Sequence, residues 1–214
     1  MLKNIPLFTY LTEPDLVALS SEAINKSFPK NTVIINEGEK SDSLYVILSG
    51  RVKVMMSGPD GREIILTMLG AGEFFGELSL VDSQPRSATV ATMEPSQFSV
   101  ISKGDFKRVM AKSPQMADHV MQGLAQRLRE ADKKISSLAL MDVYGRVART
   151  LLQLAVKREG VLVVSEKLSQ QDIANMVGAS REMVNRILKE LEGSGYIKVE
   201  SKNIIINDQL PLSL

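Results

Sequence analysis

Between about residues 28 and 102, hydrophobic and polar positions alternate in short runs, a pattern typical of β-strands. The runs are "TVIINEGE", "SLYVILSGRVKVMM", "EIILTMLGAGEFFG", "SATVATM" and "SQFSVIS", with glycines within and between them. "GPDG" at 58–61 has the composition of a hairpin turn. Many short strands with glycine turns predict a β sandwich or a barrel-like roll. Short helices are expected before it, over 5–25, with Thr12 as an N-cap.

Apolar residues recur with helical spacing after residue 113. Alternating steps of four and three join Ala117, Met121, Leu124, Leu128, Ala131, Ile135 and Leu138. This seven-residue repeat is that of a coiled coil, so it predicts a long helix that pairs with the same helix of an identical chain. The alternative is a helix that packs along its own β domain. We expect a homodimer through residues 117–138.

"SQQDIANMVGASREMVNRILKEL" at 169–191 has the layout of a helix-turn-helix. Ser169 and Ser180 are suited to cap its two helices. Ala174 is small enough to let the helices cross closely, and Gly178 supplies the turn. The alternating segment "GYIKVESKNIIIN" that follows predicts a β hairpin, which would form a wing.

The second helix of this motif is amphipathic. Its apolar stripe consists of Val184, Ile187, Leu188 and Leu191, and the opposite face carries Arg181, Glu182, Asn185, Arg186 and Lys189. Arg suits the two acceptors of guanine, and Glu can accept from the cytosine amino group. The alternative is an ordinary helix with a solvated charged face. The predicted contacts to double-stranded DNA are Ser169, Gln170, Ser180, Arg181, Glu182, Asn185, Arg186, Lys189 and, on the wing, Lys202, with Lys198 also available for phosphate.

Composition excludes several kinds of site. The chain has no cysteine and one histidine, His119, so we expect neither a cysteine- nor a histidine-based metal centre, and no enzyme activity. No apolar run is long enough to span a membrane and the N-terminus lacks a signal-peptide pattern, so we expect a cytoplasmic protein without a membrane partner. The net charge is only +1, so DNA binding must depend on where the basic residues lie.

Two charges stand out in "FFGELSLVDSQPRSATV" at 74–90. Glu77 and Arg86 lie in a strand-like region, each beside small residues. A charge buried in such a region is costly unless it is paired or meets a ligand of opposite sign. The two residues therefore either form an ion pair with each other or bind a ligand with an anionic group.

Across nearly its whole length the sequence resembles the CRP/FNR family of bacterial transcription regulators. Three motifs carry the resemblance: "FGELSLVDSQPRSATV", "LMDVYGRVARTLLQLA" and "VGASREMVNRILKELE". It implies an α+β chain with a jelly-roll-like, cyclic-nucleotide-binding β roll at 1–112, a dimerisation helix at 113–140 and a winged helix-turn-helix at 141–214.

The resemblance also implies roles for residues. Gly76 and Leu78 frame a turn whose short helix cradles a cyclic phosphate, and Glu77 accepts from the ribose 2′-hydroxyl. Arg86 pairs with the phosphate and Ser87 adds a hydroxyl contact. Base-reading positions of the family fall on Arg181, Glu182 and Arg186, so a palindromic site with TGTGA-like half-sites is expected.

The chain departs from the family on the dimerisation helix. Members that bind cyclic AMP hold the adenine with a Thr-Ser pair, where this chain has Ala131 and Asp132. The Asp132 carboxylate could accept from the N1–H and N2–H of guanine; alternatively it pairs with Arg129 or Lys133, or is solvated. Cyclic AMP is the first expected effector and cyclic GMP the second.

Other functions fit parts of the sequence. Some family members respond to cyclic di-GMP or bind DNA without a ligand, and regulatory subunits of enzymes share the first domain. The segment "VKREGVLVVSEKL" is shorter than its family counterpart, which contacts RNA polymerase, so that partner is left open.

Overall fold

The computed structural model describes residues 5–9, 11–158, 160–164, 168–200, 203–207 and 210–211. Two compact units are formed, and they divide within the long helix α4 (Pro114–Leu140). The first contains the residues up to Met56 together with Leu66–Arg129; the second contains Ser57–Ile65 together with the residues from Glu130 onward. The division of function into 1–112, 113–140 and 141–214 stays a prediction.

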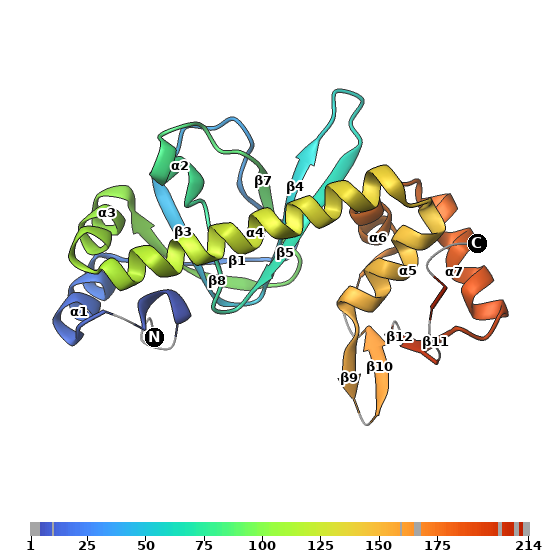
Figure 1. The fold of residues 1–214 in the computed structure, drawn as a ribbon. Helices are drawn as coiled ribbons and strands as arrows, with labels where there is room; N and C mark the ends of the chain where they lie inside the picture. The colour runs from blue at the N-terminus through green and yellow to red at the C-terminus, as the bar shows by residue number, and fades with distance from the viewer. Residues whose placement is uncertain are drawn as a thin grey trace. The chain divides into compact units, whose positions relative to one another are not determined.

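The first unit is built on two four-stranded sheets (Figure 1). Its strands are β1 (Ile24–Phe28), β2 (Val33–Ile35), β3 (Ser43–Ser49), β4 (Arg51–Ser57), β5 (Glu63–Gly70), β6 (Phe74–Phe75), β7 (Thr89–Thr92) and β8 (Ser96–Ser102). The end of β4 and the start of β5, within Ser57–Ile65, are assigned to the second unit. One sheet has the order β1-β8-β3-β6 and the other β2-β7-β4-β5. The strand pairs for which a register is given are antiparallel. The expected β roll is confirmed.

An aromatic cluster fills the core to which both sheets contribute. Tyr45 stacks on Phe75 with ring centroids 5.0 Å apart, and both rings meet Phe98 edge-on. Val52 and Val90 join the same core from the second sheet. These geometries add favourable aromatic contacts to the burial of apolar area.

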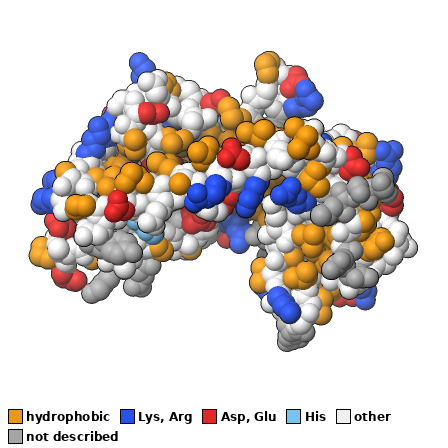
Figure 2. Space-filling model, viewed as in Figure 1, with side chains coloured by type: hydrophobic (Ala, Val, Ile, Leu, Met, Phe, Trp, Pro, Cys, Tyr) orange, Lys and Arg blue, Asp and Glu red, His pale blue; other side chains and the backbone are white. Residues whose placement is uncertain are grey.

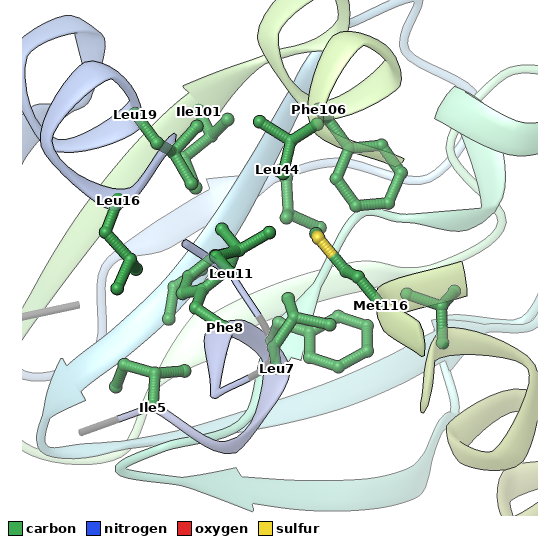
Figure 3. Packing of buried hydrophobic residues seen from close by; sticks show 14 of the residues in the cluster. Ile5, Leu7, Phe8, Leu11, Leu16, Leu19, Leu44, Ile101, Phe106 and Met116 are labelled. Carbon is green, nitrogen blue, oxygen red and sulfur yellow. The ribbon is translucent and has the colours of Figure 1, made fainter. Parts of the chain in front are cut away.

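A second core lies under the helices of this unit (Figure 3). Leu16 of α1 (Glu13–Glu22), Phe106 of α3 (Lys103–Lys112), Leu44 of β3 and Met116 of α4 pack together there with a short 3₁₀ turn at Pro6–Phe8. The predicted cap of α1 is present: the Thr12 side chain accepts from the Asp15 backbone N–H.

Two elements of this unit are absent from our sequence-based expectations. β1 has four exposed residues out of five, and it is held by pairing with β8 and by packing of Phe28 on Phe98. In α3, Phe106 and Val109 are buried and Met110 packs beside them, a helical spacing that our sequence analysis did not recognise. Ser102 caps α3 by accepting from the Asp105 backbone N–H, 3.1 Å away.

Helix α4 has two different apolar faces. Met116 and Val120 are buried in the first unit, and Leu124 packs against the same core. Met121, Leu128 and Ile135 are 57%, 64% and 64% exposed. Figure 2 shows hydrophobic side chains along the visible face of this helix, with basic side chains beside them. The predicted stripe is therefore divided: part packs on the chain's own domain and part remains uncovered.

The second unit is a small α+β module. It contains α5 (Val143–Leu154), β9 (Val156–Arg158), β10 (Val161–Val164), α6 (Gln170–Val177), α7 (Arg181–Gly193), β11 (Ile197–Glu200) and β12 (Asn203–Ile206). The strands form a sheet of order β11-β12-β10-β9, so the predicted hairpin at 195–207 pairs with the preceding strands. The predicted stripe of α7 is buried in the core of this unit.

Gly50, between β3 and β4, generates a stability prediction. Its φ is +90°, and an added Cβ would lie 2.7 Å from the Ser96 Cα. Gly50→Ala should lower the free energy of unfolding by about 3 kcal/mol or more, because backbone strain and overpacking add. Gly61 also has a positive φ but nothing within 4 Å of an added Cβ, so Gly61→Ala should cost only about 1 kcal/mol. Urea unfolding followed by circular dichroism measures both; equal losses would contradict the packing argument.

Candidate functional site

Gly76 lies at the turn between β6 and the short helix α2 (Leu78–Asp82). Its φ of +85° is one that residues with a side chain rarely adopt. An added Cβ would lie 2.5 Å from the Arg86 Nη1 and 2.9 Å from the Ser43 carbonyl oxygen. Glycine at this position therefore permits both the turn and the close approach of Arg86.

Arg86 is a buried cation, only 3% exposed. Its Nη1 donates to the Gly76 carbonyl at 2.7 Å and to the Ser79 hydroxyl at 2.8 Å. Its Nη2 donates to the Ser41 hydroxyl at 2.8 Å and to the Ser43 carbonyl at 2.7 Å. The four acceptors of these bonds are all neutral oxygens.

The surroundings of Arg86 therefore solvate its charge incompletely. Burial lowers the pKa of the guanidinium below its usual value, and the nearby acidic groups Tyr45 and Glu77 oppose this shift. An arginine nonetheless stays protonated at neutral pH. Its Nε is buried and has no hydrogen-bond partner among the described residues. A donor in this state is suited to an anion.

Glu77 is also buried, 2% exposed, and its ion pair is with Arg127 of α4 rather than with Arg86. The Arg127 Nη1 donates to the Glu77 Oε1 at 2.5 Å. The Arg127 Nη2 donates to the Phe74 carbonyl, and the guanidinium lies 5.0 Å from the Phe74 ring centroid. The other carboxylate oxygen, Oε2, has no partner in the described part of the chain.

The two partnerless atoms fit a cyclic nucleotide. The Arg86 Nε is a donor suited to a phosphodiester oxygen, and the Glu77 Oε2 is an acceptor suited to a ribose hydroxyl. Buried polar atoms are normally hydrogen-bonded, so the donor on Arg86 and the acceptor on Glu77 that lack a partner are candidates for contacts with a ligand. We refer to Gly76, Glu77, Ser79 and Arg86 as the cassette.

The remaining predicted ligand residues are exposed. Leu78 is 42% exposed at the start of α2, and Ser87 is exposed beside Arg86. Ala131 and Asp132 are exposed on α4. Among the described residues, Asp132 makes no hydrogen bond or ion pair, so the alternative pairing with Arg129 or Lys133 is not observed.

The helix-turn-helix is confirmed in its local detail. Ser169 and Asp172 form a capping box at the start of α6. Gly178 ends α6 with a φ of +64°, and Ser180 caps α7 by accepting from the Met183 backbone N–H. Ala174 is fully buried, as expected of a small residue where helices approach.

The predicted DNA-contacting face of α7 is exposed. Arg181, Glu182, Arg186 and Lys189 are exposed. Asn185 is half-buried and accepts from the Gln170 Nε2 at 3.0 Å, which joins α6 to α7. Lys202 lies outside the described residues.

Glu182 is held in its ionised form. Hydrogen bonds from its own backbone N–H and from the Ser180 hydroxyl lower the pKa of its carboxyl group, and the charge of Arg181 adds to this effect. Glu182 is therefore an acceptor at neutral pH, as contact with a cytosine amino group requires. On the wing, Lys198 forms an ion pair with Glu200 at 2.5 Å.

Neither a metal centre nor a membrane-spanning helix is found among the described residues. No group of three or more His, Asp or Glu side chains in the described ranges is placed to hold a metal ion. No helix that the structure describes is long and apolar enough to cross a bilayer.

Arg127 is the contact of the cassette that sequence reasoning missed. It lies 50 positions from Glu77, and no motif that we identified joins the two. The available signal was indirect: Arg127 follows the buried Val120 and the partly buried Leu124 at helical spacing, on the side of α4 that packs against its own domain.

Comparisons with known proteins identify both domains of the chain. Residues 25–113 match the family model of the cyclic nucleotide-binding domain, and residues 145–212 match that of the Crp-like helix-turn-helix domain. The chain is 35% identical over 212 residues to the CRP-like cAMP-activated global transcriptional regulator of Mycobacterium tuberculosis. The matched region covers 97% of this chain and 95% of that protein. It is 37% identical over 198 residues to the cAMP-activated global transcriptional regulator CRP of Pasteurella multocida, with 91% and 95% covered.

A solved structure shows the same fold. The c-di-GMP responsive global regulator CLP of Xanthomonas campestris has a TM-score of 0.80 and 27% identity, covering 92% of this chain and 100% of that one. The sequence similarity to the relatives extends over nearly the whole length of this chain, including the cassette and the helix-turn-helix. The chain therefore belongs to the CRP/FNR family of DNA-binding transcription regulators that carry a cyclic-nucleotide-binding domain.

Proposed function

We propose that the protein is a homodimeric regulator whose affinity for a palindromic DNA site is controlled by cyclic AMP bound in the cassette. The observation that carries the proposal is the pair of buried, partnerless atoms, the Arg86 Nε and the Glu77 Oε2. Arg86 binds the cyclic phosphate and Glu77 accepts from the ribose 2′-hydroxyl. Leu78 and Gly76 frame the turn, and Ser87 adds a hydroxyl contact. The role is regulatory, with no catalytic step.

The base of the effector is assigned from the relatives. Those from Mycobacterium tuberculosis and Pasteurella multocida are named as cAMP-activated, which supports cyclic AMP. Cyclic GMP is the second candidate, because Asp132 and Ala131 stand where hydroxyl residues would hold adenine. Cyclic di-GMP is a third, since the Xanthomonas campestris regulator is named as responsive to it.

Dimerisation uses the uncovered face of α4. Met121, Leu128 and Ile135 are spaced seven residues apart and are each more than half exposed, as expected for positions that a second α4 covers. A two-fold axis along this seam places two α7 helices in successive major grooves, about 34 Å apart. The proposed DNA contacts are base readers Arg181, Glu182 and Arg186, supported by Ser169, Gln170, Ser180, Asn185, Lys189 and Lys202.

Control by the nucleotide follows from linkage. The dimer exists in conformers that differ in the spacing of the recognition helices, and the nucleotide binds more tightly to the conformer that fits DNA. DNA and nucleotide then raise each other's affinity by the same factor.

Arg86→Ala tests the cassette. The substitution should weaken cyclic AMP binding by at least ten- to a hundred-fold, because each charged hydrogen bond that is lost contributes about 1.5–3 kcal/mol. Isothermal titration calorimetry on the nucleotide-free protein measures it. Arg62→Ala is the matched control, because Arg62 is an exposed arginine that pairs with Asp60 at the hairpin tip. Unchanged affinity in a folded Arg86→Ala protein would contradict the proposed role of the cassette.

Arg181→Ala tests the recognition helix. Affinity for a duplex with two TGTGA-like half-sites should fall about ten- to a hundred-fold, whereas affinity for a scrambled duplex should fall much less. Fluorescence anisotropy with saturating cyclic AMP measures both duplexes. Lys157→Ala, on the exposed strand β9, is the control and should leave both affinities nearly unchanged. An equal loss on both duplexes would show that Arg181 contacts phosphate rather than a base.

A further inference from the structure

Arg127 has donors left after its contacts within the chain. Its two described bonds, to Glu77 and to the Phe74 carbonyl, use one N–H of each terminal nitrogen, whereas a guanidinium has five N–H groups. Its side chain is 30% exposed, so part of it faces away from the cassette. Asp132, five residues further along α4, is exposed and makes no hydrogen bond or ion pair among the described residues.

The exposed apolar residues fix the heptad positions along α4. Met121, Leu128 and Ile135 occupy one core position, a, because they recur every seven residues and are uncovered. Leu124 and Ala131 then occupy the other core position, d. Arg127, directly before Leu128, is at g, and Asp132, directly after Ala131, is at e.

In a parallel two-stranded coiled coil, the g side chain of one helix lies beside the e side chain of the next heptad on the other helix. Along α4 the g and e combinations are Val120 with Ala125, Arg127 with Asp132, and Lys134 with Ala139. Arg127 with Asp132 is the combination with opposite charges. Lys134 instead donates to the Ile65 backbone carbonyl of its own chain.

We propose that Arg127 donates to Asp132 of the partner subunit, so that one guanidinium connects Glu77 of the cassette with the dimer seam. The proposal rests on the proposed parallel homodimer. The dimer then has two symmetry-related charge pairs at the seam. In each pair, the arginine also contacts the Glu77 carboxylate of its own cassette. Binding of a nucleotide to Glu77 then acts directly on a group that aligns the two helices.

The pair also bears on the choice of base. A carboxylate that accepts from Arg127 has fewer lone pairs to offer the N1–H and N2–H of guanine. Asp132 in this role favours cyclic AMP over cyclic GMP, because guanine has to displace an arginine to reach the carboxylate.

Charge exchange between two chains tests the pair. One chain carries Arg127→Glu and the other carries Asp132→Arg, and both carry Glu77→Gln so that the new glutamate does not face a buried carboxylate. Each homodimer then has two like-charge pairs, whereas the heterodimer has two opposite-charge pairs. The chains are co-expressed with tags of different mass, and native mass spectrometry measures the dimer populations.

We expect heterodimers to rise from about one half, the random value, to about four-fifths or more. The control replaces Arg127→Glu with Arg129→Glu, at an outward-facing position of the heptad, and should return about one half. A random distribution in the test mixture, with the unsubstituted protein dimeric, would overturn the pair and leave the proposed function standing. A monomeric unsubstituted protein would overturn the proposed homodimer itself.

Discussion

The cassette depends on a buried guanidinium that is held by neutral oxygens. Four hydrogen bonds from Arg86 tie together the β6–α2 turn, α2 and the residues at the start of β3. Burying a cation among such acceptors is less favourable than hydrating it, so the arrangement retains an attraction for an anion. Gly76 permits the arrangement because a side chain there would meet the Arg86 Nη1. The fold of the domain therefore leaves Arg86 able to attract an anionic ligand.

Helix α4 connects the cassette to the rest of the chain. Arg127, on the side that faces its own domain, forms an ion pair with Glu77, and Met121 and Leu128 lie on the uncovered face. The same helix continues to the residues that precede α5 of the helix-turn-helix unit. A change of hydrogen bonding at Glu77 therefore acts on a helix that also bears the proposed dimer seam. Such a shared element is one physical route by which two binding sites are coupled.

Local patterns predicted much of the fold. The buried stripe of α7, its Ser180 cap and the Gly178 turn each depend on residues within one or two helical turns, so a single sequence contains them. Two elements were missed: α3 has a short apolar stripe of Phe106, Val109 and Met110 that was not recognised, and β1 is mostly exposed and is held by pairing with β8 and by packing of Phe28.

Contacts distant in sequence could not be predicted in this way. The seven-residue stripe on α4 was expected to form one seam, yet Leu124 packs against the chain's own core. The partner of Glu77 was expected to be Arg86 or a ligand, and the ion pair in fact joins Glu77 to Arg127, 50 positions away. Such a contact depends on how α4 crosses the β roll, which no local pattern specifies. The resemblance to the CRP/FNR family supplied the chemistry of the cassette, but the partnerless atoms became visible only with the side chains in place.

The central claim is that a nucleotide in the cassette controls binding of DNA. The most direct test is the affinity of the nucleotide-stripped dimer for a duplex with two TGTGA-like half-sites, measured by fluorescence anisotropy with and without saturating cyclic AMP. The account predicts that cyclic AMP raises the affinity by about 5- to 150-fold, the usual range of coupling between sites. Equal affinity in both conditions, with cyclic AMP shown to bind, would contradict it.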